Sequence, residues 1–277
     1  MTANKVVKES TIRPPKGWES VDFRELFEYM DLLGFLIKRN IKVLYAQTIL
    51  GFAWAIINPL VQITVFSIIF GKLANLNSDG MPYFLFSTVA IIPWTYMSDA
   101  MSTSSQSLVA GQNMLGKVYF PRIIFPLTPV LSKLVDFAIS LILLIGVMFY
   151  YDVVPTAKLL LLPIFIVLMV SVPIGIGLWL SSLAIRFRDV KYAMSFLVKM
   201  LLYSAPILYS ANEIPDQYRL LYSINPIVGV VEGFRACLLG TEILWIYIVP
   251  GMVTSVILLW TGAIYFRRME RIVVDVI

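Results

Sequence analysis

Long apolar runs constrain this chain more than any other feature of its sequence. A helix needs about 20 mostly apolar residues to cross the hydrocarbon core of a bilayer. Only 14% of the 277 residues are charged, against roughly 25% in soluble domains. The sequence therefore predicts an all-α polytopic membrane protein. Its transmembrane domain is expected over 49–266, with six spans near 49–70, 83–101, 126–150, 159–185, 192–209 and 243–266.

Basic residues give the expected orientation of these spans. If both termini are cytoplasmic, the cytoplasmic segments hold 17 of the 22 Lys and Arg residues and the outer segments hold 4, with Lys199 inside a span. An excess of Lys and Arg in cytoplasmic loops is the main determinant of orientation. We therefore expect cytoplasmic tails at 1–20 and 267–277. The net charge of +5 is explained by topology and does not indicate nucleic-acid binding.

Two features of the composition narrow the chemistry. The chain has no histidine and a single cysteine, Cys237. Histidine is the usual proton shuttle near neutral pH and the commonest metal ligand. One cysteine cannot form a disulfide within the chain. We therefore expect no catalytic residue, no metal site and no cofactor bound by this chain.

Residues 21–48 are predicted to form an amphipathic helix with its lead-in. Apolar residues recur there at steps of three and four, and the opposite face is acidic. Such a helix typically lies in the membrane interface. Because an acidic face is not attracted to anionic lipid, contact with a protein partner is favoured over simple anchoring. The candidate residues of this interface helix are Phe23, Glu25, Phe27, Glu28 and Asp31.

The polar stretch 111–122 nearly spells the nucleotide-binding loop Gly-x-x-x-x-Gly-Lys-Ser/Thr. Val118 stands where a hydroxyl residue should ligate magnesium, and the stretch lies between apolar runs. We therefore expect a cytoplasmic loop that does not itself bind ATP. Pro121 restricts the helix before it. Lys117 and Arg122 can either contact carboxylates of a partner or serve only as cytoplasmic positive charges.

The connection 210–242 is apolar enough over 224–239 to suggest a seventh span. Glu232 and Arg235 argue against it, because a charge at the bilayer centre costs roughly 2.5–3.5 kcal/mol or more. A seventh span would also place the basic C-terminus outside. We expect a re-entrant outer hairpin of short helices, in which Glu232 and Arg235 pair across one helical turn.

Polar and aromatic residues inside the spans are candidates for a transport path. Asn58, Gln62, Asp99, Asp136 and Lys199 are expected to face protein or water, and Lys133 is expected to pair with Asp136. Lys199 can snorkel or meet a lipid phosphate. Aromatic faces stack on sugars, although Trp and Tyr are also enriched at membrane interfaces. The candidate channel-lining residues are Trp54, Asn58, Gln62, Trp94, Tyr96 and Tyr203.

The order of these features resembles the membrane subunits of type-2 ABC exporters. The likeness is closest to those that export lipid-linked polysaccharides such as O-antigen, capsule and teichoic acid. A basic connection follows the second span, a charged turn follows the fourth, and an outer hairpin precedes the sixth. The residues that carry the resemblance are Asn113, Lys117, Phe120, Pro121 and Arg122, then Arg186, Phe187, Arg188 and Asp189, then Asn225, Pro226, Glu232, Gly233, Phe234 and Arg235.

This resemblance implies a homodimeric channel in the bacterial cytoplasmic (inner) membrane. Two copies of a separate ATPase, which binds ATP and Mg, would dock on the loop 111–122. Arg186, Arg188 and Asp189 would add a second contact, bind lipid phosphates, or form only a charged turn. The outer hairpin, with Asn225, Pro226, Glu232 and Arg235, would gate the channel. The substrate would be a glycan on a polyprenyl-pyrophosphate lipid.

Three other functions remain as alternatives. An ABC exporter of a small amphiphile or drug would share these features, because the substrate does not follow from the fold. An ion-coupled secondary carrier commonly shows inverted repeats, and the sequence shows no repeat. An intramembrane transferase needs a nucleophile or converging acids, and no carboxylates cluster in the sequence.

Overall fold

A computed structural model describes residues 23–46, 48–115 and 120–276 of the chain, and the side chains of 26–46, 48–114 and 120–270. Several predictions concern residues outside this description. They are the tail 1–20, Lys117 and Val118, and the side chains of Phe23, Glu25 and residues 271–277.

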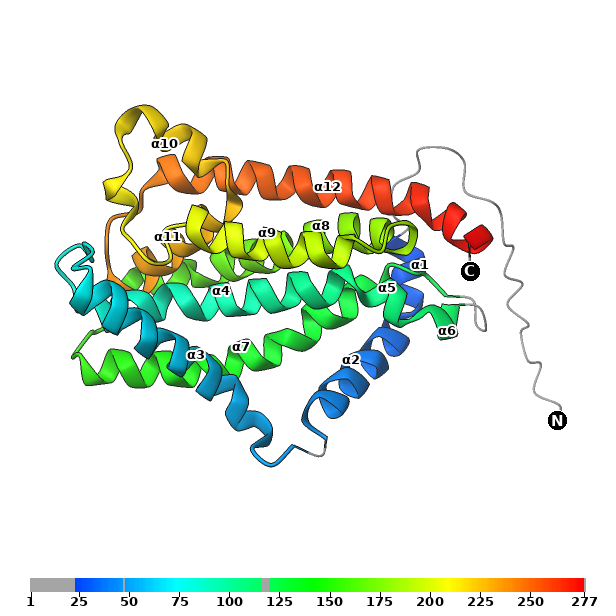
Figure 1. Ribbon diagram of the computed structural model, residues 1–277, viewed down its shortest axis with the longest axis horizontal. Coiled ribbons are helices and arrows are strands. Elements are labelled where there is room, and N and C mark those ends of the chain that lie inside the picture. Colours follow the sequence, from blue (N-terminus) through cyan, green and yellow to red (C-terminus); the bar gives the residue numbers. More distant parts are fainter. Residues whose placement is uncertain (1–22, 47, 116–119, 277) are drawn as a thin grey trace, which may run out of the picture.

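The described residues form helices and connecting turns, without a strand (Figure 1). The α-helices are α1 (Phe23–Glu28), α2 (Met30–Tyr45), α3 (Trp54–Phe66), α4 (Tyr83–Ser105), α5 (Ser107–Ala110), α6 (Gln112–Leu115), α7 (Ile124–Tyr150), α8 (Leu162–Arg186), α9 (Val190–Ser204), α10 (Asp216–Ser223), α11 (Pro226–Leu239) and α12 (Trp245–Val276). Shorter segments are 3-10 turns at Gly51–Ala53, Ala157–Leu161 and Ala211–Glu213, and a π-helical segment at Ser67–Leu73.

Four helical segments of the described chain are long and apolar enough to cross a membrane. Their bounds are Gly51–Leu73, Ile124–Tyr150, Ala157–Arg186 and Trp245–Glu270, which match four of the predicted spans. The other two predicted spans correspond to α4, which is less apolar because Ser, Thr, Pro and Asp interrupt it, and to α9, which has only 15 residues. The count of six spans therefore stays a prediction.

Helix α4 lies at the centre of the bundle. It packs against α7 on one side and α8 on another, and α8 packs in turn against α12. Most α4 residues are buried, and Phe86, Val89, Ala90 and Met97 are fully enclosed. This burial explains how the polar residues of α4 are accommodated: protein surrounds most of the helix, so its polar side chains can bond to neighbouring helices.

The bundle has two distinct ends (Figure 1). One end, here called the α6 end, holds α1, α5, α6 and the C-terminal part of α12. The opposite end, the α10 end, holds α10, α11 and the loop after α3. Helix α2 begins at the α6 end and runs obliquely away from it, beside α7.

Candidate functional site

At the α6 end, the residues after α6 pack directly against α2. Phe120 is 4% exposed and forms a buried cluster with Leu33 and Leu36 of α2 and Ile124 of α7. Its ring centre lies 5.4 Å from that of Phe125. The loop 111–122, which is predicted to contact the ATPase and is here called the coupling loop, is therefore joined to α2 of the interface helix through the buried side chain of Phe120.

The same loop is also tied to the last helix. The Arg122 guanidinium donates a hydrogen bond of 2.7 Å from Nη1 to the backbone oxygen of Glu270 in α12. The Glu270 carboxylate pairs with Arg267 at 2.8 Å. Arg122 therefore has a partner within its own chain, a contact that sequence reasoning could not find because 148 residues separate the two.

A polar cluster joins α2, α4 and α7 further into the bundle. Lys133 Nζ lies 2.8 Å from Asp136 Oδ2, which confirms the predicted pair, and 3.3 Å from Asp99 Oδ2 in α4. The Tyr45 hydroxyl of α2 donates a hydrogen bond to Asp136. Asp99 and Asp136, two charged residues inside predicted spans, thus both pair with Lys133. The Tyr45 hydroxyl connects α2 to Asp136.

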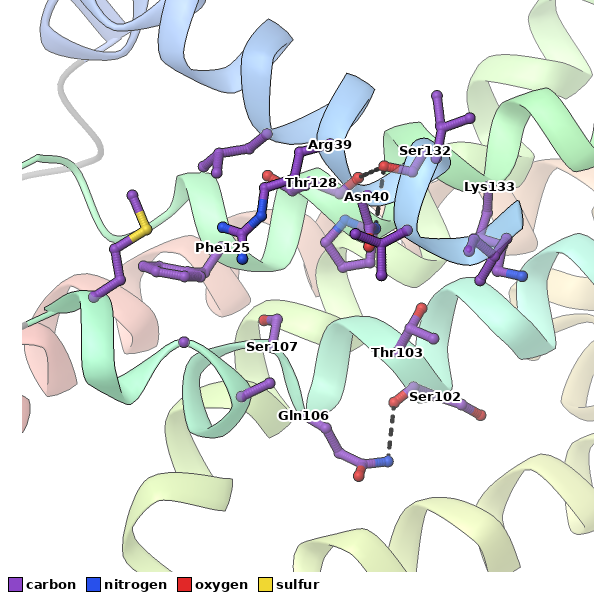
Figure 2. A pocket seen from close by; sticks show the side chains of 18 of the residues that line it. Arg39, Asn40, Ser102, Thr103, Gln106, Ser107, Phe125, Thr128, Ser132 and Lys133 are labelled. Atoms are coloured by element: carbon purple, nitrogen blue, oxygen red, sulfur yellow. Dashed lines mark hydrogen bonds between the residues drawn. The ribbon is translucent and has the colours of Figure 1, made fainter. Parts of the chain in front are cut away.

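Between these helices lies a cleft of about 650 Å³ (Figure 2). Helix α2 forms one wall, α4 and α5 form the opposite wall, and α7 closes the back. Many of the side chains that line it carry hydroxyl or amide groups: Asn40, Ser102, Thr103, Gln106, Ser107, Asn113, Thr128 and Ser132. A smaller neighbouring cavity of about 250 Å³ is lined by Trp54, Asn58, Tyr96, Asp99 and Asp136, among others.

At the α10 end, a buried ion pair within α11 faces α4. Arg235 Nη1 lies 2.8 Å from Glu232 Oε1, with the two side chains 3% and 11% exposed, which confirms the predicted pair. The Arg235 Cζ atom lies 3.7 Å from the ring centre of Phe86. Asn225 caps α11 by accepting a hydrogen bond from the Ile227 N–H. The single cysteine, Cys237, is fully buried in the same helix.

Two loops meet at the α10 end. The Asp79 carboxylate accepts hydrogen bonds from Ser210 Oγ at 2.7 Å and from Asn212 Nδ2 at 3.2 Å. Asp79 has φ of +52°, a left-handed conformation that Asp tolerates better than most residues. In the adjoining α10, burial and a hydrogen bond to the Tyr209 hydroxyl raise the pKa of Tyr222.

Comparison with known proteins places this architecture in a family. The model of the family described as "ABC-2 type transporter" matches residues 31–239, from the start of α2 to the end of α11. The chain belongs to this family. ABC-2 chains are transport proteins of the membrane, which agrees with the apolar helices described above.

Several curated relatives align with most of this ABC-2 chain. The O-antigen export system permease protein RfbA of Myxococcus xanthus is 27% identical over 258 residues, which are 89% of this chain and 96% of that protein. A protein of the same name from Klebsiella pneumoniae is 26% identical, covering 87% and 92%. The polysialic acid transport protein KpsM of Escherichia coli is 24% identical, covering 72% and 78%.

The remaining predicted residues of the ABC-2 chain lie in different environments. The turn after α8, with Arg186, Arg188 and Asp189, is exposed at the α6 end. Among the channel-lining candidates, Trp54, Asn58 and Tyr203 are exposed, Gln62 is half-buried, and Trp94 and Tyr96 are buried. Lys199 is exposed on α9.

The predicted interface helix consists of two helices, because the chain breaks at Tyr29. Its apolar side is only partly covered: Leu33 and Leu36 are buried, whereas Phe27 is 71% exposed. Glu28 and Asp31 are exposed, as an acidic polar face requires.

Proposed function

We propose that this chain is the membrane subunit of an ATP-driven exporter that moves a lipid-linked polysaccharide across the bacterial inner membrane. The observation that carries the proposal is the family match from α2 to α11. Relatives named as O-antigen export permeases, which align over almost the whole chain, support the polysaccharide as substrate. The glycan would travel on a polyprenyl-pyrophosphate lipid.

The proposed topology has six spans, with α4 and α9 added to the four apolar segments, and both termini in the cytoplasm. The charged turn after α8, the end of α12 and the described parts of the loop 111–122 lie at the α6 end, so this end would face the cytoplasm, as the positive-inside rule requires. The α10 end would face outward, with α10 and α11 as a re-entrant gate. Backbone that enters a bilayer without crossing it needs protein around it, and the burial of α11 meets that need.

The chain itself would bind no nucleotide. Two copies of it would form the channel, and two copies of a separate ATPase would bind ATP and Mg and dock at the α6 end. The loop there packs on α2 through Phe120 and bonds to α12 through Arg122. A displacement of the loop by the ATPase would therefore move α2, α7 and α12 together, and the Tyr45–Asp136 hydrogen bond would carry the motion of α2 into the bundle.

The test is export in a deletion strain complemented with wild-type or variant chain. The strain should accumulate lipid-linked glycan in the cytoplasmic leaflet, and the wild-type chain should restore export. Lys117→Glu and Arg122→Glu should reduce export severely while the chain still reaches the membrane. Lys72→Glu is the control, because it is an equal charge reversal at an exposed residue that follows α3, outside the loop 111–122 and the proposed gate, and it should leave export intact.

Two results would contradict the proposal. Normal export in both loop variants would remove the coupling role of 111–122. Export of a small amphiphile, with no glycan accumulating in the deletion strain, would replace the substrate. Co-purification with an ATPase, and stimulation of its activity by this chain, would be measured in parallel.

A further inference from the structure

The cleft between α2, α4, α5 and α7, here called the α2–α4 cleft, has a distribution of charge that suits an anion. Among the described side chains that line it, only Arg39 and Lys133 carry charge, and none is a carboxylate. Lys133 pairs with both Asp99 and Asp136. These two carboxylates outnumber its single positive charge, and they line the neighbouring cavity and not the cleft. The uncompensated charge in the cleft is therefore that of Arg39.

Arg39 has no hydrogen bond or ion pair to any other described residue, although its side chain extends from α2 into the cleft (Figure 2). Lys133 is paired with two carboxylates, whereas the N–H donors of Arg39 are available to a ligand. A guanidinium presents five N–H donors in a planar fork that matches phosphate and carboxylate oxygens. Arg39 is exposed, so water can reach its guanidinium, and the anionic oxygens of a ligand in the cleft can replace that water.

The opposite wall is suited to a different chemical group. The hydroxyls of Thr103 and Ser107 donate to helix carbonyls, at 2.7 Å to the Asp99 oxygen and 2.7 Å to the Ser104 oxygen. Their own oxygens can still accept hydrogen bonds. The Gln106 amide nitrogen donates to the Ser102 oxygen at 3.3 Å, which leaves its carbonyl as an acceptor. This wall therefore offers acceptors to a ligand rich in hydroxyl groups, such as a sugar.

The position of the cleft restricts where such a ligand comes from. The cleft lies beside α2, an amphipathic helix at one end of the apolar bundle, and its rim includes the apolar side chains of Leu36, Val43 and Leu44. Val43 and Leu44 are exposed, so a chain of apolar carbons can leave the cleft along them. A ligand with a polar head and an apolar tail fits this geometry.

We propose that the α2–α4 cleft binds the phosphate-bearing sugar headgroup of a membrane lipid. Arg39 binds the phosphate oxygens, and Thr103, Gln106 and Ser107 accept hydrogen bonds from the sugar. This inference rests on the proposed function to the extent that a lipid-linked glycan is the lipid with such a headgroup. It adds the location and the residues of the site at which the exporter first holds its substrate.

The experiment measures lipid binding to the purified full-length chain in complex with its ATPase. The probes are a polyprenyl diphosphate carrying one sugar, the same diphosphate without sugar, phosphatidylglycerol and inorganic pyrophosphate. Arg39→Gln should weaken binding of both polyprenyl diphosphates by about tenfold or more, as expected for loss of a charge-assisted hydrogen bond. Lys38→Gln removes the same charge from the neighbouring position, which does not line the cleft, and should leave binding unchanged.

A second variant tests the sugar contact. Gln106→Leu should weaken binding of the sugar-bearing lipid several-fold and leave the sugar-free diphosphate unaffected. Within the described part of the chain, Arg39 has no hydrogen-bond or ion-pair partner and the Gln106 side chain bonds only to the Ser102 backbone oxygen, four residues earlier, so neither variant should change the melting temperature of the complex.

Three results would overturn the inference. The first is that Arg39→Gln and Lys38→Gln change lipid binding equally. The second is that phosphatidylglycerol binds as tightly as the sugar-bearing lipid. The third is that free pyrophosphate binds as tightly as the sugar-bearing lipid. Glycan export is measured separately. If the wild-type chain exports glycan and Arg39→Gln binds the probes like wild type, this inference fails and the proposed function stands. If the wild-type chain exports no glycan, the proposed function itself fails.

Discussion

Replacing Arg235 by methionine should destabilise the α10 end more than any change to an exposed charge. Arg235→Met replaces the guanidinium by an apolar group of similar length. It removes the ion pair with Glu232 and the contact of the guanidinium with the Phe86 ring. It leaves the Glu232 carboxylate, which is 11% exposed, without its cationic partner. The Nε and Nη2 atoms of Arg235 have no hydrogen-bond partner among the described residues, so only the ion pair and the ring contact compensate for burying this guanidinium.

The magnitude follows from the burial of the pair. Removing one partner of a buried ion pair costs about 3–5 kcal/mol, because the remaining charge is uncompensated. In chains of 150–250 residues each kcal/mol lowers the melting temperature by about 2–4 °C, so the expected loss is about 6–20 °C. The double variant Glu232→Leu with Arg235→Met should lose less than Arg235→Met alone, because no buried charge remains.

The assay is thermal unfolding of the purified chain in detergent, followed by tryptophan fluorescence. The matched control is Asp216→Asn, which removes the ion pair of Asp216 with Arg219. That pair has the same i,i+3 spacing and an N–O distance of 2.7 Å, but the Asp216 side chain is 85% exposed. Exposed pairs contribute about 1 kcal/mol or less, so the control should barely shift. If Arg235→Met lowered the melting temperature no more than Asp216→Asn, the pair would not be what holds α11 in place.

Two further predictions concern close packing and the loops at the α10 end. Gly177→Ala should destabilise the chain by about 1–3 kcal/mol, because the added Cβ would meet Ser104 Oγ at 2.1 Å. Gly146→Ala adds the same atom where nothing lies within 4 Å, and by thermal unfolding it should be neutral or stabilising by up to about 1 kcal/mol. Asp79→Ala should speed hydrogen exchange in both 74–82 and 210–213, since it removes the acceptor of two hydrogen bonds that join them and leaves the bond from Asn77 to Glu213. Faster exchange in 74–82 alone would contradict that link.

Local spacing explains which contacts the sequence could predict. Glu232 with Arg235, and Lys133 with Asp136, are three residues apart in helices, so their pairing follows from helix geometry alone. Arg122 with Glu270 and Tyr45 with Asp136 are 148 and 91 residues apart, and no periodicity relates them. Their contacts depend on how the helices pack. Phe120 and Arg122 are candidates from the sequence, but their partners in α2, α7 and α12 are known only from the structure.

Hydropathy likewise predicted where helices occur but not what surrounds them. The sequence predicts 83–101 as a span like the others, yet α4 is the central and most enclosed long helix. An apolar side chain suits lipid and protein surroundings equally well, so hydropathy does not distinguish the two. The apolar periodicity of 23–36 predicted one apolar face for the interface helix, of which Leu33 and Leu36 are buried. It did not indicate that Leu33 and Leu36 are covered by Phe120 and Ile124 whereas Phe27 is exposed.

The buried position of Cys237 has a practical consequence. It is the only thiol of the chain and is fully enclosed in α11, so an alkylating reagent can reach it only when that helix separates from its neighbours. The rate of alkylation then reports the free energy of this local opening. No cysteine has to be introduced or removed for the measurement. Comparing the rate with and without ATP, in membranes that also hold the ATPase, would show at which step of the nucleotide cycle the α10 end opens.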